Sequence, residues 1–129
     1  MHQHQIYPEL RLIVIELIGP VTFEQLLKGT EELLAHPDFD QSFNGVTDYR
    51  RAEIQFSPAE LKRFTDLTQT KQVALGTWCM LVSGTQQTAM VTLFKHQVEA
   101  QHPIELFSTL KAASAFIGTD LSKFLGPGE

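Results

Sequence analysis

The sequence contains a single cysteine, Cys79, in 129 residues. One cysteine excludes an internal disulfide and is typical of a protein from a reducing compartment. No apolar run approaches the roughly 20 residues that span a bilayer. The first five residues, Met-His-Gln-His-Gln, lack the basic and apolar segments of a secretory signal. We therefore expect a cytoplasmic protein.

Clusters of basic residues are also missing. The chain has 10 Lys and Arg against 15 Asp and Glu, a formal net charge of −5. Nucleic-acid binding needs clustered cations that contact phosphates, so we expect no nucleic-acid partner. Residues 1–40 carry seven of the acidic residues and two of the basic ones. This acidic third is either a solvated helix face or a surface that faces the basic middle of a second subunit. We predict a homodimer.

Catalytic, metal-binding and nucleotide-binding motifs are absent as well. His2 and His4 share a strand face, but two ligands make no closed metal site, so we predict no metal and no other cofactor. Ser83-Gly84-Thr85 lacks the glycine and lysine pattern of nucleotide-binding loops. Cys79 lies inside an apolar run, where a thiol behaves as a small hydrophobe and not as a nucleophile. We expect no enzymatic activity and assign no catalytic residue.

What is present is an alternation of strand and helix signals in a chain long enough for one domain. Apolar and β-branched runs predict strands at residues 3–7, 10–18, 43–48, 73–82 and 104–107. Capping residues before apolar stripes predict helices that begin at Thr22, at Ser57, after Ser83-Gly84-Thr85 and at Ser108. Gly19-Pro20 is expected to end the second strand.

This order predicts an α/β fold, because strands that alternate with helices form a mostly parallel sheet with right-handed crossovers. We expect about five strands, an N-terminal β-hairpin and four helices in a single domain at residues 1–125. Residues 126–129, Gly-Pro-Gly-Glu, are expected to form a flexible C-terminal tail.

A family resemblance rests on stretches that cover nearly the whole chain: Leu12–Gly19 with Thr22–Gln25, His36–Phe39, Val46–Arg50, Ser57, Val73–Leu75 and Phe107–Phe116. In these the chain resembles the STAS fold, and more closely the SpoIIAA-like (STAS/SEC14-type) small bacterial proteins. The resemblance implies a non-catalytic binding module. SEC14-type carriers enclose an apolar ligand, which implies a lipid-like or apolar small molecule, or a membrane surface, as the partner.

The same resemblance implies an alternative, a protein-interaction regulator related to anti-sigma-factor antagonists, with a regulatory protein as its partner. Those antagonists carry a phosphorylatable serine at the start of the helix after the strand that corresponds to residues 43–48. This chain has Asp48-Tyr49-Arg50-Arg51 at that place, and the first serine that follows, Ser57, comes nine residues after Asp48. Ser57 is thus a helix cap with, at most, a weak regulatory role.

The stretch from Asp48 to Ser57 is the first candidate binding region, because ligands bind at the ends of strands in such folds. Asp48, Arg50 and Arg51 form either exposed salt bridges or an arginine site for a carboxylate or phosphate headgroup beside a helix N-terminus. A second set is aromatic and forms either plain core or the lining of a pocket between a helix and the sheet: Phe56, Phe64, Trp78 and Phe94. In the pocket interpretation, the second or third helix opens as a lid.

Overall fold

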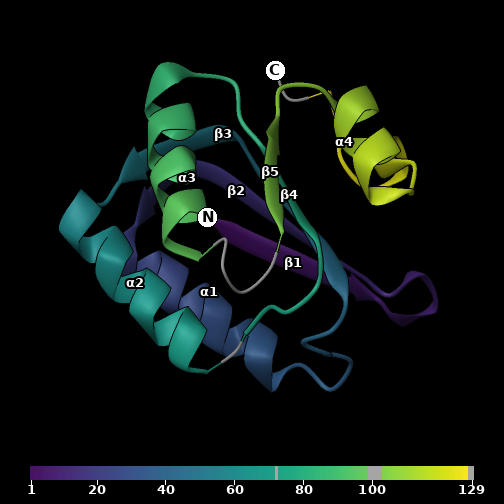
Figure 1. The fold of residues 1–129 in the computed structure, drawn as a ribbon, viewed down its shortest axis with the longest axis horizontal. Coiled ribbons are helices and arrows are strands. Elements are labelled where there is room, and N and C mark those ends of the chain that lie inside the picture. The colour runs from purple at the N-terminus through teal and green to yellow at the C-terminus, as the bar shows by residue number, and fades with distance from the viewer. Residues whose placement is uncertain (72, 99–102, 128–129) are drawn as a thin grey trace.

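The computed structural model describes residues 1–71, 73–98 and 103–127. Its five-stranded sheet has the strand order β1-β2-β3-β4-β5 (Figure 1). β1 pairs antiparallel with β2, and the other neighbours pair parallel. The strands are β1 (His2–Tyr7), β2 (Leu12–Thr22), β3 (Asn44–Gln55), β4 (Trp78–Leu81) and β5 (Ile104–Phe107). The predicted α/β class, with an N-terminal hairpin and a mostly parallel sheet, is confirmed.

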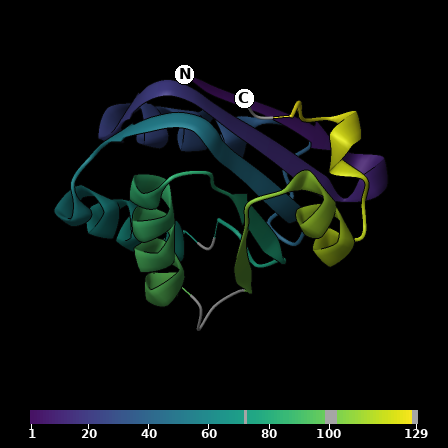
Figure 2. The same ribbon diagram turned by 90° about the horizontal axis from the view of Figure 1, so that it is seen from above.

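Four α-helices in the described residues cover the two faces of the sheet unequally. They are α1 (Phe23–Ala35), α2 (Pro58–Thr70), α3 (Thr85–Val98) and α4 (Leu110–Ile117). α1, α2 and α3 lie on one face and α4 lies on the other, next to a 3-10 turn, Leu121–Lys123 (Figure 1). In the view from above, β4 and β5 lie between α3 and α4 (Figure 2). β4 is buried along its whole length, as its apolar sequence predicts.

The helix starts follow the capping signals closely. The side chain of Thr22 accepts a hydrogen bond from the backbone N–H of Gln25, and that of Ser57 accepts one from the backbone N–H of Glu60. In both boxes the third residue's side chain accepts from the cap's own N–H, so both capping boxes are complete. The last helix begins one residue later than predicted, because its cap is Thr109 and not Ser108.

β2 and β3 are longer than predicted. The strand prediction ended β2 at Gly19-Pro20, but β2 continues to Thr22, and β3 runs to Gln55 with Thr22 paired to Gln55. β1 pairs with β2 only as far as Leu17. Beyond that point β2 is an edge strand on that side, where the missing N–H of proline costs no ladder hydrogen bond.

β4 is shorter than predicted, because residues 73–77 leave the sheet. Leu75 donates its N–H to the carbonyl of Gln41 at 2.8 Å, which ties this segment to the loop before β3. Gly76 lies so close to that loop that a Cβ atom would come within 2.3 Å of the Phe43 carbonyl oxygen. A residue with a side chain would push the segment outward. Val73 and Ala74 are thereby placed over the sheet, where they line a cavity.

Candidate functional site

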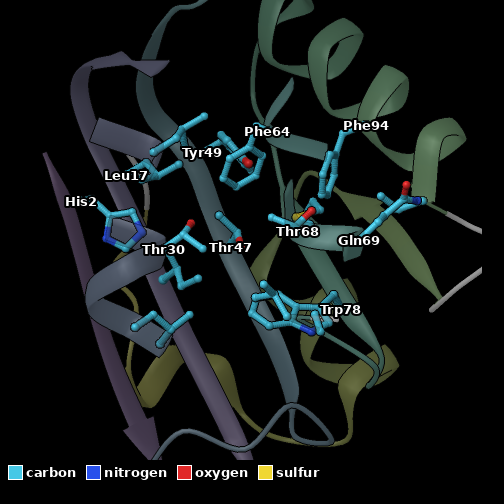
Figure 3. A pocket seen from close by; sticks show the side chains of 17 residues that line it. His2, Leu17, Thr30, Thr47, Tyr49, Phe64, Thr68, Gln69, Trp78 and Phe94 are labelled. Atoms are coloured by element: carbon cyan, nitrogen blue, oxygen red, sulfur yellow. The ribbon is translucent and has the colours of Figure 1, made fainter. Parts of the chain in front are cut away.

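A partly open cavity of about 90 Å³ lies between the sheet and the helices α1, α2 and α3 (Figure 3). Its walls are mainly apolar, and its floor comes from β2, β3 and β4. α2 packs mainly on α1 and α3, and it places Phe64, Thr68 and Gln69 over the cavity. α2 is therefore the helix that covers the cavity.

Among the described residues of the lining there is no aspartate, glutamate, lysine or arginine. Its polar members are His2, Thr30, Thr47, Tyr49, Thr68, Gln69 and Trp78. Some already have partners: the Thr68 hydroxyl donates to the Thr65 carbonyl at 2.9 Å, and the Gln69 amide donates to the Gln97 carbonyl at 2.8 Å. Burial raises the pKa of the Tyr49 hydroxyl to about 12, so Tyr49 is neutral at pH 7. The described part of the lining is therefore uncharged but not wholly apolar.

Two buried nitrogen atoms of this lining have no hydrogen-bond partner among the described residues: Nδ1 of His2 and Nε1 of Trp78. Only 5% of Trp78 is exposed. Buried polar groups in native proteins are nearly always hydrogen-bonded, so each exception needs an explanation. Both atoms have almost no accessible surface, so neither faces the open space of the cavity.

His2 forms part of the cavity wall through an unusually close contact with α1. A Cβ atom on Gly29 would come within 2.3 Å of Cγ of His2, so only glycine leaves room for the imidazole. Burial and the neighbouring His4 imidazole lower the pKa of His2 to about 4, although Glu32 acts in the opposite direction. His2 is therefore neutral at pH 7. No group of three or more metal-ligating side chains occurs in the part of the chain that the structure describes.

Three of the four predicted aromatic residues come together at this cavity. Phe64, Trp78 and Phe94 all line it, and the ring centroids of Phe64 and Phe94 are 6.2 Å apart (Figure 3). Phe56 is not a lining residue: it is 7% exposed and belongs to a core cluster with Ala52 and neighbouring apolar residues. Its role in the structure is packing.

The predicted charged residues lie on the other face of the sheet. Thr47 and Tyr49 line the cavity, so Asp48, between them on β3, points to the face covered by α4. Asp48 and Arg50 form a two-pronged ion pair, with Nε to Oδ1 and Nη2 to Oδ2 both at 2.9 Å. The Arg50 side chain is 5% exposed and that of Asp48 is 2% exposed. The exposed salt bridge expected for these two residues is instead a buried one.

Arg50 also holds the end of the described chain. Its Nη2 donates to the carbonyl of Gly126 at 2.8 Å, and its Nη1 donates to that of Pro127 at 3.1 Å. Residues 128–129 of the predicted tail lie outside the described residues. Arg51 differs from its neighbour: it is 38% exposed in a pair with Glu16. The structure thus separates the predicted headgroup residues from the aromatic ones.

Ser57 and Cys79 lie away from the cavity. Ser57 is exposed and its hydroxyl accepts the Glu60 N–H at 3.1 Å as the cap of α2. Cys79 is fully buried, and burial raises the pKa of its thiol to about 12. That thiol stays protonated at neutral pH, as expected of a small buried hydrophobe.

Several lining residues escaped prediction from the sequence. Thr47 and Tyr49 lay next to the charged residues that drew attention, and only the alternation of side chains along β3 indicates that they face the helices. For His2 the indication was its place in the first strand, on the same face as the apolar Ile6. No local pattern in the sequence indicates its contact with Gly29.

No protein-family model matches the sequence, and no curated protein matches it either. Among solved structures, an uncharacterized protein of the DUF3478 family from Shewanella loihica PV-4, described as having a SpoIIAA-like fold, matches with a TM-score of 0.59 and 11% identity. That match covers 91% of this chain and 92% of the other.

The anti-sigma factor antagonist SpoIIAA, in its unphosphorylated form, matches with a TM-score of 0.55 and 11% identity. The match covers 92% of this chain and 98% of that one. At such identities the likeness concerns the fold alone. Together with the strand order and the hairpin, the two matches show that this chain has a SpoIIAA-like fold of the STAS type.

Proposed function

We propose that this domain is a non-catalytic binding module that holds a small apolar molecule between the sheet and α1, α2 and α3. The observation that supports this proposal is the cavity itself, since a mainly apolar hollow with a few polar groups in its wall is the usual form of a small-molecule site. The wall residues that the structure describes include no charged side chain and no pair of groups arranged for acid–base or nucleophilic chemistry.

The size of the cavity limits what it holds. About 90 Å³ is room for a small ring or a short chain, well below the roughly 300–1,000 Å³ of typical ligand pockets. A lipid-like ligand with a long chain requires α2 to move away from the sheet. Such a movement is consistent with the packing of α2, which rests mainly on the neighbouring helices. None of the helices in the described ranges is long and apolar enough to cross a membrane.

A cavity-filling variant tests this proposal. Thr30→Leu adds bulk on the cavity side of α1, and Thr88→Leu makes the same change at an exposed position of α3. Small neutral molecules such as cyclohexanone should shift the amide resonances of cavity residues in the wild type and in the control variant Thr88→Leu. They should shift them far less in Thr30→Leu. Equal shifts in all three proteins, or none in the wild type, would contradict the proposal.

Native mass spectrometry after gentle purification tests the lipid-like form of the same proposal. A co-purifying mass that is lost in Thr30→Leu would support it. A clean apo mass that takes up nothing from a lipid extract would limit the ligand to small molecules. The same spectrum reports the oligomeric state, where the homodimer stays a prediction.

A second function, regulation through a protein partner, is favoured by the position of Ser57. Because β3 extends to Gln55, Ser57 follows the strand almost directly and is exposed at the first turn of α2. SpoIIAA, an anti-sigma factor antagonist, has the same fold. A phosphate at a helix N-terminus is electrostatically tolerated. Phosphopeptide mapping of protein recovered from its native cells would reveal a phosphate on Ser57, and its absence under all growth conditions would argue against regulation at this residue.

A further inference from the structure

Thr47 is a polar residue in the otherwise apolar centre of the cavity floor. It lies on β3, and the register of the sheet places Ile15 of β2 and Met80 of β4 directly beside it. All three side chains line the cavity, and Thr47 is the one that carries a hydroxyl group. Valine fills nearly the same space without a hydroxyl group, so packing of the floor alone does not require threonine at this position.

The hydroxyl group of Thr47 has no hydrogen-bond partner among the described residues, although only 6% of the residue is exposed. It differs from Nε1 of Trp78, because it is not one of the unpartnered atoms that have almost no accessible surface. The open space in front of Thr47 is the cavity (Figure 3). A buried hydroxyl without a partner costs free energy, so Thr47 marks a position in the cavity for a polar atom of a bound molecule.

The other hydroxyl groups of the lining differ from that of Thr47 in burial or in bonding. Thr68 of α2 donates its hydroxyl to the Thr65 carbonyl at 2.9 Å, within its own helix. Thr30 of α1 and Tyr49 of β3 also lack a partner in the part of the chain that the structure describes, but both residues are less buried than Thr47. Thr47 is therefore the deepest available hydroxyl group of this wall.

The wall restricts the charge of the atom that meets this hydroxyl group. A carboxylate that entered the cavity would lose its hydration, and the described wall residues include no cation that would compensate. Arg50 lies on the other face of the sheet and donates to Asp48 and to two backbone carbonyls. An uncharged oxygen atom needs only one donor, which a threonine hydroxyl group supplies.

We infer that Thr47 selects the ligand by donating a hydrogen bond to an uncharged oxygen atom of a small molecule, such as the carbonyl oxygen of a ketone or an ester. The apolar body of this molecule lies against Phe64 and Phe94, which line the same cavity from α2 and α3. This inference rests on the proposed function and adds to it the class of ligand and the residue that recognises it.

Two probes of nearly equal shape, cyclohexanone and methylenecyclohexane, test the inference, because only the ketone has an oxygen acceptor. A six-membered ring is close to the upper limit for the cavity, since an engineered apolar cavity of roughly 150 Å³ binds benzene. Thr47→Val removes the free hydroxyl group, and Thr68→Val makes the same change where the lining hydroxyl is already bonded. Binding is followed through the amide resonances of Ile15 and Met80, which flank Thr47 in the sheet.

The informative quantity is the change in the ratio of the two affinities between proteins, because the two probes differ in hydration as well as in hydrogen bonding. Thr47→Val should weaken the binding of cyclohexanone about fivefold to tenfold, the factor that one hydrogen bond of about 1–1.4 kcal/mol produces. It should leave the affinity for methylenecyclohexane equal or higher. Thr68→Val should keep the ratio of the wild type. Binding of the alkene to each variant also shows that its cavity is intact.

The outcomes separate this inference from the proposed function. An affinity ratio that is the same in the wild type and in Thr47→Val would overturn the inference and leave the binding module intact. An equal change of the ratio in Thr68→Val would also overturn it, since the effect would then come from packing. Tighter binding of cyclohexanecarboxylate than of cyclohexanone to the wild type at neutral pH would contradict an uncharged ligand. If no probe binds the wild type, the cavity holds water alone, and the proposed function and the inference both fail.

Discussion

The neighbouring residues Arg50 and Arg51 allow one prediction to be made in detail, because the same substitution removes two very different ion pairs. Arg50 is buried with Asp48, and Arg51 is paired with Glu16 at the surface. Arg50→Ala leaves the Asp48 carboxylate buried without its cation and leaves the carbonyls of Gly126 and Pro127 without their donor. Arg51→Ala removes a contact that water replaces.

The expected magnitudes differ by several fold. Removing one partner of a buried pair costs about 3–5 kcal/mol of the free energy of unfolding. An exposed pair is worth roughly 0–1 kcal/mol. With a urea m-value of about 1–3 kcal/mol/M, Arg50→Ala should lower the denaturation midpoint by roughly 1–5 M, and Arg51→Ala by at most about 1 M. Fluorescence of Trp78, the single tryptophan, reports unfolding.

Two further measurements make the reasoning refutable. The double variant Asp48→Ala/Arg50→Ala should be less destabilised than the two single variants added together, because it leaves no unpaired charge. Raising the salt concentration should shrink the difference between wild type and Arg51→Ala and leave that for Arg50→Ala nearly unchanged. Equal midpoints for Arg50→Ala and Arg51→Ala would show that the buried pair does not stabilise the fold.

Three other predictions use single side chains. Burial and the His4 imidazole hold the pKa of His2 near 4 in the folded state, against 6.5 for the free side chain. The stabilising contribution of neutral His2 should therefore be fully present above pH 6.5 and decrease as the pH falls toward 4. His2→Gln should flatten that decrease in urea midpoints measured across this pH range. Gly45→Ala should cost about 1–3 kcal/mol in the same assay, because its Cβ would come within 2.5 Å of the rigid Trp78 ring, and Gly84→Ala, with open space around it, should cost much less. Cys79, with a pKa of about 12, should react with a thiol reagent only in denaturant, and rapid reaction of the native protein would contradict its burial.

Local signals predicted the helix starts and the class of the fold well. Capping boxes at Thr22 and Ser57 involve residues three apart, and the same residues form them in the structure. Strand lengths were predicted less well, because a strand's end depends on its neighbour. β3 runs to Gln55 since β2 continues beside it, and the apolar run that starts at Val73 contributes only residues 78–81 to the sheet. In both cases, pairing with residues far away in sequence determines where the strand ends.

The candidate site was predicted in part, for a related reason. Burial and apolar character mark Phe64, Trp78 and Phe94 as inward-facing residues, and they do meet at the cavity. Composition cannot show which inward-facing residue has a gap beside it, so Phe56 seemed equivalent and proved to be core. The charges at Asp48 and Arg50 were the most conspicuous local feature, yet Arg50 contacts the chain end at Gly126 and Pro127, which is far away in sequence.

The predicted binding region around Asp48 has side chains on both faces of β3. Thr47 and Tyr49 point into the cavity, and Asp48 points to the opposite face, so neighbouring residues serve different layers. The pairing of β2 and β3 then shifts register between Glu16 and Ile18. There the side-chain amide of Gln87 in α3 donates to the carbonyl of Ala52 at 2.9 Å. Its Oε1 accepts the backbone N–H of Ser83, and the Ser83 hydroxyl donates to the carbonyl of Arg50. Loss of the Asp48–Arg50 pair should therefore affect ligand binding only through the stability of β3, whereas substitutions at Thr47 or Tyr49 should change ligand affinity in a fold that remains intact.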